Sequence, residues 1–145
     1  FEKVGLHLVG LKMVSPTQEH FHHHYETIGQ LATRRGKEVL DVNAAFMMSG
    51  PVVAMVWEGI EAIEVVRKMV GSTEPKSALP GTIRGDYSAM SYGYADANKA
   101  WITNLIHASA TPEEAEQEVA LWFSGAEIFD HDVEGHLYKR GHRKN

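Results

Sequence analysis

Cysteine is absent from the 145 residues of this chain. Its absence excludes a disulfide framework and any reaction that requires a thiol. No apolar run approaches the roughly 18 residues of a membrane-spanning helix. Phe1-Glu2-Lys3 leads straight into an alternating apolar run, which is not the pattern of a signal peptide. We therefore expect a cytoplasmic protein without a membrane partner.

Positive charge is also in short supply. The chain has 14 Lys and Arg residues against 19 Asp and Glu residues, which gives a formal net charge of −5. This balance disfavours a general or specific nucleic-acid binder, although a local cationic pocket for an anionic substrate stays open. With 43% hydrophobic and 23% charged residues, the composition is typical of one globular domain. We expect a single domain over residues 1–145, with a basic tail at 134–145.

Apolar periodicity predicts strands at 6–14 and 51–57 and helices at 41–50 and 60–70, the last closed by Gly71. Two further helices should begin at capping boxes, in which a hydroxyl residue is followed by proline and then by Glu or Gln. The two sets are Ser15, Pro16 and Gln18, and Thr111, Pro112 and Glu114.

The remaining stretches predict a polar break at 33–38, a long loop at 71–86 and a β-hairpin at 87–107 with a polar tip at 96–98. Strands and helices then follow one another in the order β-α-α-β-α-loop-β-β-α. This order favours an α+β fold in which helices cover one face of an antiparallel sheet.

His107 is expected to end a strand just before the helix that starts near Thr111. Glu118 lies two turns into that helix and could reach back to the imidazole. Such a pair fixes the tautomer and leaves the other ring nitrogen free to attack. A lone histidine on an apolar strand can equally be a structural residue.

Arg67, Thr73 and Arg84 flank or lie in the long loop. Two guanidinium groups and a hydroxyl are what a polyphosphate needs, because forked donors match its oxygens and cations offset its charge. The alternative interpretation is a pair of arginines that solvates a surface loop.

Three motifs make the pattern specific: "SGPVVAMVWEG" (49–59), "PGTIRGD" (80–86) and "NLIHAS" (104–109). Together with "HY" at 24–25 and "EAEQEVALWF" at 114–123, they resemble the nucleoside diphosphate kinase family, in the family's order. The resemblance spans residue 1 to about residue 129.

The resemblance implies a role for each matching residue. His107 matches the histidine that accepts the γ-phosphate of a nucleoside triphosphate and passes it to a nucleoside diphosphate. Glu118 matches the carboxylate that orients this ring. The nucleotide-binding residues matched are Tyr25, Arg67, Thr73, Arg84, Asn104 and Ser109.

The resemblance also implies a ferredoxin-like fold, with helices packed on a four-stranded antiparallel sheet. It implies Mg²⁺ held through substrate phosphates and water rather than by protein ligands, which suits that ion. It further implies a homo-oligomer, either a tetramer or a hexamer built from dimers.

The family opens with a strand that ends in Lys-Pro-Asp and then a helix, whereas this chain has no Lys-Pro-Asp and so lacks that first strand. We favour the interpretation that the chain is a fragment of a longer reading frame. In the alternative, a shortened protein should fold poorly and be inactive, because the neighbours of a central strand would keep unpaired backbone groups.

Two segments, at 26–39 and 90–101, are longer than in the family. The position of the family's base-stacking aromatic falls at Val39 or Leu40, neither of which is aromatic. Residues 107–110 read His-Ala-Ser-Ala where the family has His-Gly-Ser-Asp. The second lengthened segment should extend the hairpin.

The run of His20, His22, His23 and His24 suits a solvated helix face better than a zinc site, although His20 and His24 are spaced for one. We expect a phosphotransferase. The alternative is a non-catalytic nucleotide-binding or oligomerisation module of the same fold.

Overall fold

The structure is a computed structural model that describes residues 1–28 and 37–131. Its elements are, in chain order, η1 (Glu2–Val4), β1 (His7–Val14), α1 (Gln18–His22), the π-helical η2 (His23–Ile28), α3 (Lys37–Met47), β2 (Val52–Glu58), α4 (Ala62–Val70), η3 (Pro75–Ser77), α5 (Ile83–Tyr87), α6 (Tyr92–Asn98), α7 (Pro112–Trp122) and η4 (Gly125–Glu127).

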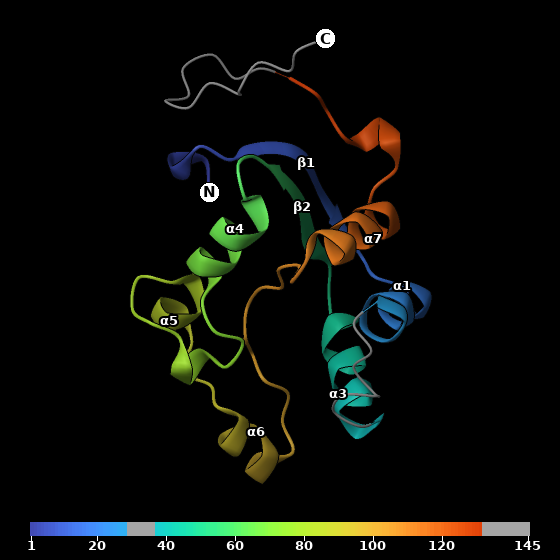
Figure 1. Cartoon of the computed structure of the whole chain (residues 1–145). Coiled ribbons are helices and arrows are strands. Elements are labelled where there is room, and N and C mark those ends of the chain that lie inside the picture. Colours follow the sequence, from blue (N-terminus) through green and yellow to red (C-terminus); the bar gives the residue numbers. More distant parts are fainter. Residues whose placement is uncertain (29–36, 132–145) are drawn as a thin grey trace.

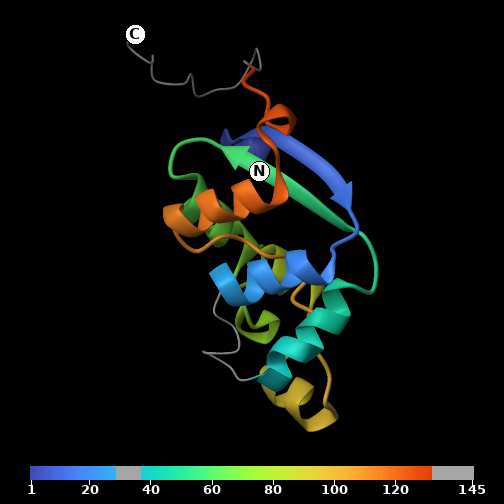
Figure 2. The ribbon, with the colours of Figure 1, turned by 90° about the vertical axis from the view of Figure 1, so that its right-hand side faces the viewer.

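Strands β1 and β2 pair antiparallel, from His7 opposite Glu58 to Val14 opposite Val52, with one irregularity between Leu8 and Gly10. Helices α1, α3, α4, α5, α6 and α7 lie on one side of this two-stranded ribbon (Figures 1 and 2). The arrangement is the α+β, ferredoxin-like class that the sequence predicts. Among the described residues, the buried apolar side chains that form the core are Leu6, Val9, Phe21, Val70, Ala95 and Phe123.

Several predicted elements are confirmed. Both strands occur where the apolar runs place them, and α4 ends at Gly71, whose φ of 88° lies in the left-handed region. Helix α7 begins after Thr111, whose side chain accepts a hydrogen bond from the backbone N–H of Glu114. The acidic partner differs slightly from a capping box, because the Glu114 carboxylate accepts from the N–H of Ala110 instead of that of Thr111.

The first helix starts later than predicted. Its N-cap is Thr17 and not Ser15, because the Thr17 hydroxyl accepts from the backbone N–H of His20. After one turn the chain changes to π-helical hydrogen bonding in η2. Helix α3 starts at Lys37, four residues before the predicted Asp41.

The predicted hairpin at 87–107 is wrong. Residues 92–98 form helix α6, capped by the Ser91 hydroxyl, which accepts from the N–H of Tyr94. The loop at 71–86 likewise contains η3 and runs into α5. Residues 99–110 form an irregular segment without a strand, so the described part of the chain has two strands instead of four.

Three predictions lie wholly or partly outside the described residues: the basic tail at 134–145, most of the polar break at 33–38 and residues 29–36 of the lengthened segment at 26–39. Among the helices of the described ranges, none combines the length and the apolar character that crossing a membrane requires.

Candidate active site

His107 lies in the irregular segment that precedes α7, not at the end of a strand. Its Nε2 is 2.7 Å from Oε1 of Glu118, which projects from the second turn of α7. The imidazole is 43% exposed, whereas the carboxylate is 8% exposed. A buried carboxylate therefore holds an imidazole that solvent can reach.

Glu118 is held as the anion. Burial alone would raise its pKa, but the hydrogen bond and charge of His107, the hydrogen bond of Ser109 and the charge of His24 together leave the pKa below its ordinary value of 4.5. The Ser109 hydroxyl donates to Oε2 at 2.5 Å. Because an ionised carboxylate only accepts, Nε2 of His107 must carry the proton. The lone pair of His107 is then on Nδ1.

His24 is a third member of this cluster and is 5% exposed. Its ring lies edge-to-face with that of His107, at a centroid separation of 4.6 Å. The indole N–H of Trp122 donates to Nδ1 of His24 at 3.2 Å, so this nitrogen is an unprotonated acceptor. Burial is the largest cause that lowers the pKa of His24 to about 4, followed by the charge of His107.

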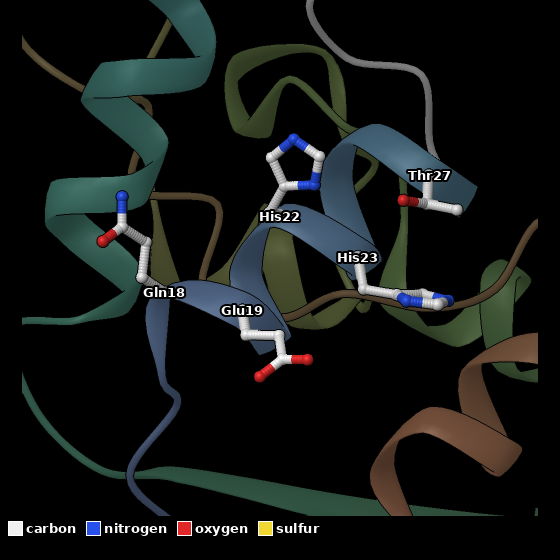
Figure 3. Close-up of a pocket in the computed structure, with 5 residues that line it drawn as sticks. All are labelled: Gln18, Glu19, His22, His23 and Thr27. Carbon is white, nitrogen blue, oxygen red and sulfur yellow. The ribbon is translucent and has the colours of Figure 1, made fainter.

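The prediction of a solvated face for all four histidines is thus wrong for His24. It is right for His22 and His23, which are exposed and line an open hollow on α1 and η2 together with Gln18, Glu19 and Thr27 (Figure 3). His20 is half-buried and contacts Thr17 and Trp122. Its Nδ1 is 2.8 Å from the Thr17 hydroxyl, and its ring stacks on Trp122.

Tyr25 follows His24 and contacts its ring edge-to-face at 4.7 Å. Burial, and then the negative charge of Glu118, raise the pKa of the Tyr25 hydroxyl to about 12. The phenol is therefore a neutral group beside the carboxylate. The structure brings Tyr25 to the same cluster as His107.

Arg84 is buried, and its guanidinium donates to three backbone carbonyls. Nε donates to the oxygen of Asn104 at 3.0 Å, Nη1 to that of Gly71 at 2.9 Å and Nη2 to that of Ile106 at 2.5 Å. The side chain thus ties the end of α4 to the segment that leads into His107. The two Nη atoms each keep one further N–H, which could serve a ligand.

The backbone in that segment is sharply folded. The N–H of Asn104 donates to the oxygen of Ile102 at 2.9 Å, and that of Ile106 to the oxygen of Asn104 at 2.8 Å. Leu105 has a φ of 70°, a left-handed conformation that is costly for a branched side chain. These local bonds replace the ladder of the predicted strand.

Arg67, from the last turn of α4, lies next to the same segment. Its Nη1 donates to the backbone oxygen of Ala108 at 3.0 Å. The positive charge of Arg67 is the second cause, after burial, that lowers the pKa of Arg84, so the two cations are close enough to repel. Thr73 is exposed beyond the end of α4, outside the cluster of His107, Glu118 and His24.

Sequence reasoning missed Trp122 and the part played by His24. Trp122 is four residues after Glu118, so both side chains lie on one face of α7. That spacing was a usable signal. The approach of η2 to this face depends on tertiary packing and leaves no local pattern.

Comparison with known proteins agrees with this geometry. The family model described as nucleoside diphosphate kinase matches residues 1–128. A nucleoside diphosphate kinase of Borreliella burgdorferi is 41% identical over 90% of this chain and 78% of its own length. One of Pyrococcus furiosus is 44% identical over 90% of this chain and 73% of its own length.

Solved structures show the same likeness. A transition state mimic of the Borrelia burgdorferi nucleoside-diphosphate kinase, with bound vanadate and ADP, has a TM-score of 0.87 at 40% identity and covers 92% of this chain and 79% of that one. A halophilic enzyme from Halobacterium salinarum in complex with CDP has a TM-score of 0.74 at 39% identity, with coverages of 92% and 78%. The chain therefore belongs to the nucleoside diphosphate kinase family.

Proposed function

We propose that this chain transfers the γ-phosphate of a nucleoside triphosphate to a nucleoside diphosphate, with His107 as the nucleophile. The observation that carries the proposal is the bond from Nε2–H of His107 to Glu118, because it leaves the Nδ1 lone pair free on an exposed ring. Membership of the nucleoside diphosphate kinase family supplies the reaction class.

In the first half-reaction, Nδ1 of His107 attacks the γ-phosphorus. A nitrogen–phosphorus bond forms, the bond from phosphorus to the bridging oxygen breaks, and the nucleoside diphosphate leaves. Glu118 stabilises the positive charge that develops on the imidazole, and Ser109 fixes the orientation of Glu118. In the second half-reaction, an oxygen of another diphosphate takes the phosphate from Nδ1.

The cationic side of the site supports an anionic substrate. Arg67 and Arg84 lie near each other and near the segment that ends in His107. An anion placed between them would remove their repulsion and receive forked hydrogen bonds. Arg67 then contacts phosphate directly, and Arg84 contributes its two remaining N–H groups. We assign Tyr25, Thr73 and Asn104 to the nucleotide as the resemblance implies.

Mg²⁺ is the cofactor of this family. In the arrangement that attacks phosphate, both oxygens of Glu118 accept hydrogen bonds, from His107 and from Ser109. The residues beside it are cationic or neutral, which suits an ion that arrives on the phosphates and keeps its waters. When bound, Mg²⁺ would offset the negative charge of the phosphates. We also propose a cytoplasmic homo-oligomer built from dimers, on the ground of the family resemblance.

The test is incubation of the full chain with γ-labelled ATP and Mg²⁺, followed by measurement of intact mass at neutral pH. We expect one acid-labile phosphate on the wild type and none on His107→Ala. His22→Gln is the matched control, because it removes an exposed histidine outside the site. A folded wild type that gains no phosphate would favour the non-catalytic module instead.

A further inference from the structure

His24, His107 and Glu118 present one ligand atom each, and all three atoms lie within 4.8 Å of one another. We propose that these residues form a binding site for a first-row transition metal ion such as Zn²⁺, and that the bound ion switches off phosphate transfer. The inhibitory part rests on the proposed role of His107. The binding part does not.

The distances are close to those of a coordination sphere. Oε1 of Glu118 is 2.7 Å from Nε2 of His107 and 3.5 Å from Nδ1 of His24. Ligand atoms of a tetrahedral zinc ion are roughly 3.3 Å apart, given bonds of about 2.0–2.1 Å. These two separations differ from that value by less than about 1 Å, and the third, between the two ring nitrogens, is within 4.8 Å. Ring rotations that displace the nitrogens by up to about 1.5 Å would therefore complete the coordination sphere.

The contact between His24 and Glu118 leaves room for a cation. Because Nδ1 of His24 accepts from Trp122, its lone pair and a carboxylate oxygen approach each other as two acceptors at 3.5 Å. This is not an ion pair, since an imidazole whose Nδ1 accepts a hydrogen bond is neutral. A cation between the two atoms would turn a repulsive approach into two coordinate bonds.

The donor set selects the class of metal. Two neutral imidazoles and one carboxylate are the ligands of catalytic and regulatory zinc sites, with a fourth position left for water. Mg²⁺ prefers oxygen ligands and keeps its hydration shell, so this cluster does not compete for it. The exposed ring of His107 gives the ion a path from solvent.

Metal coordination by His107 would leave its ring without a lone pair that can attack phosphate. A metal ion at Nε2 of His107 displaces the proton that this nitrogen now carries in its hydrogen bond to Glu118. The proton moves by way of solvent to Nδ1. The ring remains neutral, and no electron transfer is involved. Because Nδ1 then carries a proton, it has no lone pair for the γ-phosphorus.

Trp122 opposes metal binding, because its indole N–H occupies the lone pair of His24. The exposed pair His22 and His23 is the natural competitor for an added metal, and it lines the open hollow on α1 and η2 (Figure 3). Trp122 therefore supplies a variant that should raise metal affinity, and His22 with His23 supply a variant that should leave it unchanged.

The experiment titrates the full chain with Co²⁺, without nucleotide, and follows visible absorption, with Zn²⁺ as the displacing ion. We expect one ion per chain. His24→Gln should weaken binding by about tenfold or more. Trp122→Phe should strengthen it by roughly two- to tenfold, because it removes a competing hydrogen bond. The double variant His22→Gln/His23→Gln should bind as the wild type does.

Binding that is unchanged in His24→Gln, lost in the double variant, or weaker in a folded Trp122→Phe would overturn the site. If Trp122→Phe fails to fold, the other two variants still decide. The second arm measures phosphorylation from γ-labelled ATP in excess Mg²⁺ at buffered free Zn²⁺. We expect labelling to fall over the range in which Zn²⁺ binds, and His24→Gln to need about tenfold more Zn²⁺.

The two proposals fail separately. A chain that binds Co²⁺ through His24 but is never phosphorylated keeps the metal site and loses the enzymatic role of His107. A chain that is phosphorylated at saturating Zn²⁺ keeps the enzymatic role and loses the inhibition.

Discussion

His24 is a buried base whose neutral form the fold requires. Burial lowers its pKa to about 4, while the unfolded chain should titrate near 6.5. The folded state therefore binds fewer protons than the unfolded state between these values. The contribution is fully present above pH 6.5 and is lost as pH falls toward 4, by about 3 kcal/mol of unfolding free energy.

We expect urea unfolding of the wild type to show this loss between pH 6.5 and 4. In His24→Gln the slope over this window should be much smaller, because glutamine does not titrate. Glu118, which faces His24, adds a loss in the same direction at lower pH, since its pKa is below 4.5. Equal slopes in the two proteins would contradict the assignment.

Glu118→Gln separates orientation from charge at the same site. The amide oxygen can still accept from Nε2–H of His107, but the negative charge that stabilises the imidazolium is gone. We expect the rate of phosphorylation from γ-labelled ATP to fall by about 10²-fold or more. Ser109→Ala is the matched comparison, because it removes one hydrogen bond to Glu118 and keeps the charge. A larger loss in Ser109→Ala than in Glu118→Gln would refute this ranking.

At the scale of elements, Arg84 joins α5, the end of α4 and the segment before His107. Its three hydrogen bonds to carbonyls hold a folded backbone that includes Leu105 in a left-handed conformation. Arg84→Met should lose about 3 kcal/mol or more of stability, because charged hydrogen bonds of about 1.5–3 kcal/mol each disappear and leave carbonyls unpaired.

Arg84→Lys keeps the charge but replaces the fork with a single point, so an intermediate loss is expected. Urea unfolding measures the stability, and amide exchange of residues 104–106 measures the freedom of the segment. Unchanged exchange in a folded Arg84→Met would show that other contacts hold the segment in place.

The elements that sequence predicted correctly have local causes. Helix α7 follows from the Thr111 cap and Pro112, and β2 from an uninterrupted apolar run. Helix α6 was missed because Tyr92 and Tyr94 alternate with small residues, as they would in a strand. Its start is set by Ser91 and by Glu74, 18 residues upstream, whose carboxylate accepts from the N–H of Tyr92 at 2.9 Å.

The features of the site also divide into those with local causes, which sequence predicts, and those that depend on tertiary packing. The closeness of His107 and Glu118 could be predicted, because the helix start at Thr111 places Glu118 two turns into the helix, within reach of a residue just before that start. The burial of His24 could not, because it depends on η2 packing against α7. Nor could the engagement of Arg84 with carbonyls, since only the folded backbone places Gly71 and Ile106 on either side of one guanidinium.

For the whole molecule, the segment after α7 closes the outer edge of the ribbon. The backbone N–H of Phe129 donates to the oxygen of Val9 at 2.8 Å. Lys12 pairs with Glu127 at 2.9 Å and lies over the ring of Phe123. The backbone N–H of Ser124 and then Lys12 lower the pKa of Glu127 to about 2, so the pairing should persist in mild acid.

Gly10 sets how closely this segment approaches β1. A Cβ atom at Gly10 would lie 3.1 Å from Ile128, 3.2 Å from Phe123 and 3.2 Å from Val56. We expect Gly10→Ala to push the segment outward and to cost about 1–2 kcal/mol of stability. The loosened segment should also become more sensitive to limited proteolysis.

Gly93 is the matched control, because a Cβ atom there meets nothing within 4 Å and the residue lies inside α6. Gly93→Ala should therefore stabilise the protein by about 0.5–1 kcal/mol through helix propensity. Urea midpoints should move in opposite directions for the two substitutions. A shift of both in the same direction would mean that backbone entropy, and not the contact of residues 123–129 with β1, decides the effect at Gly10.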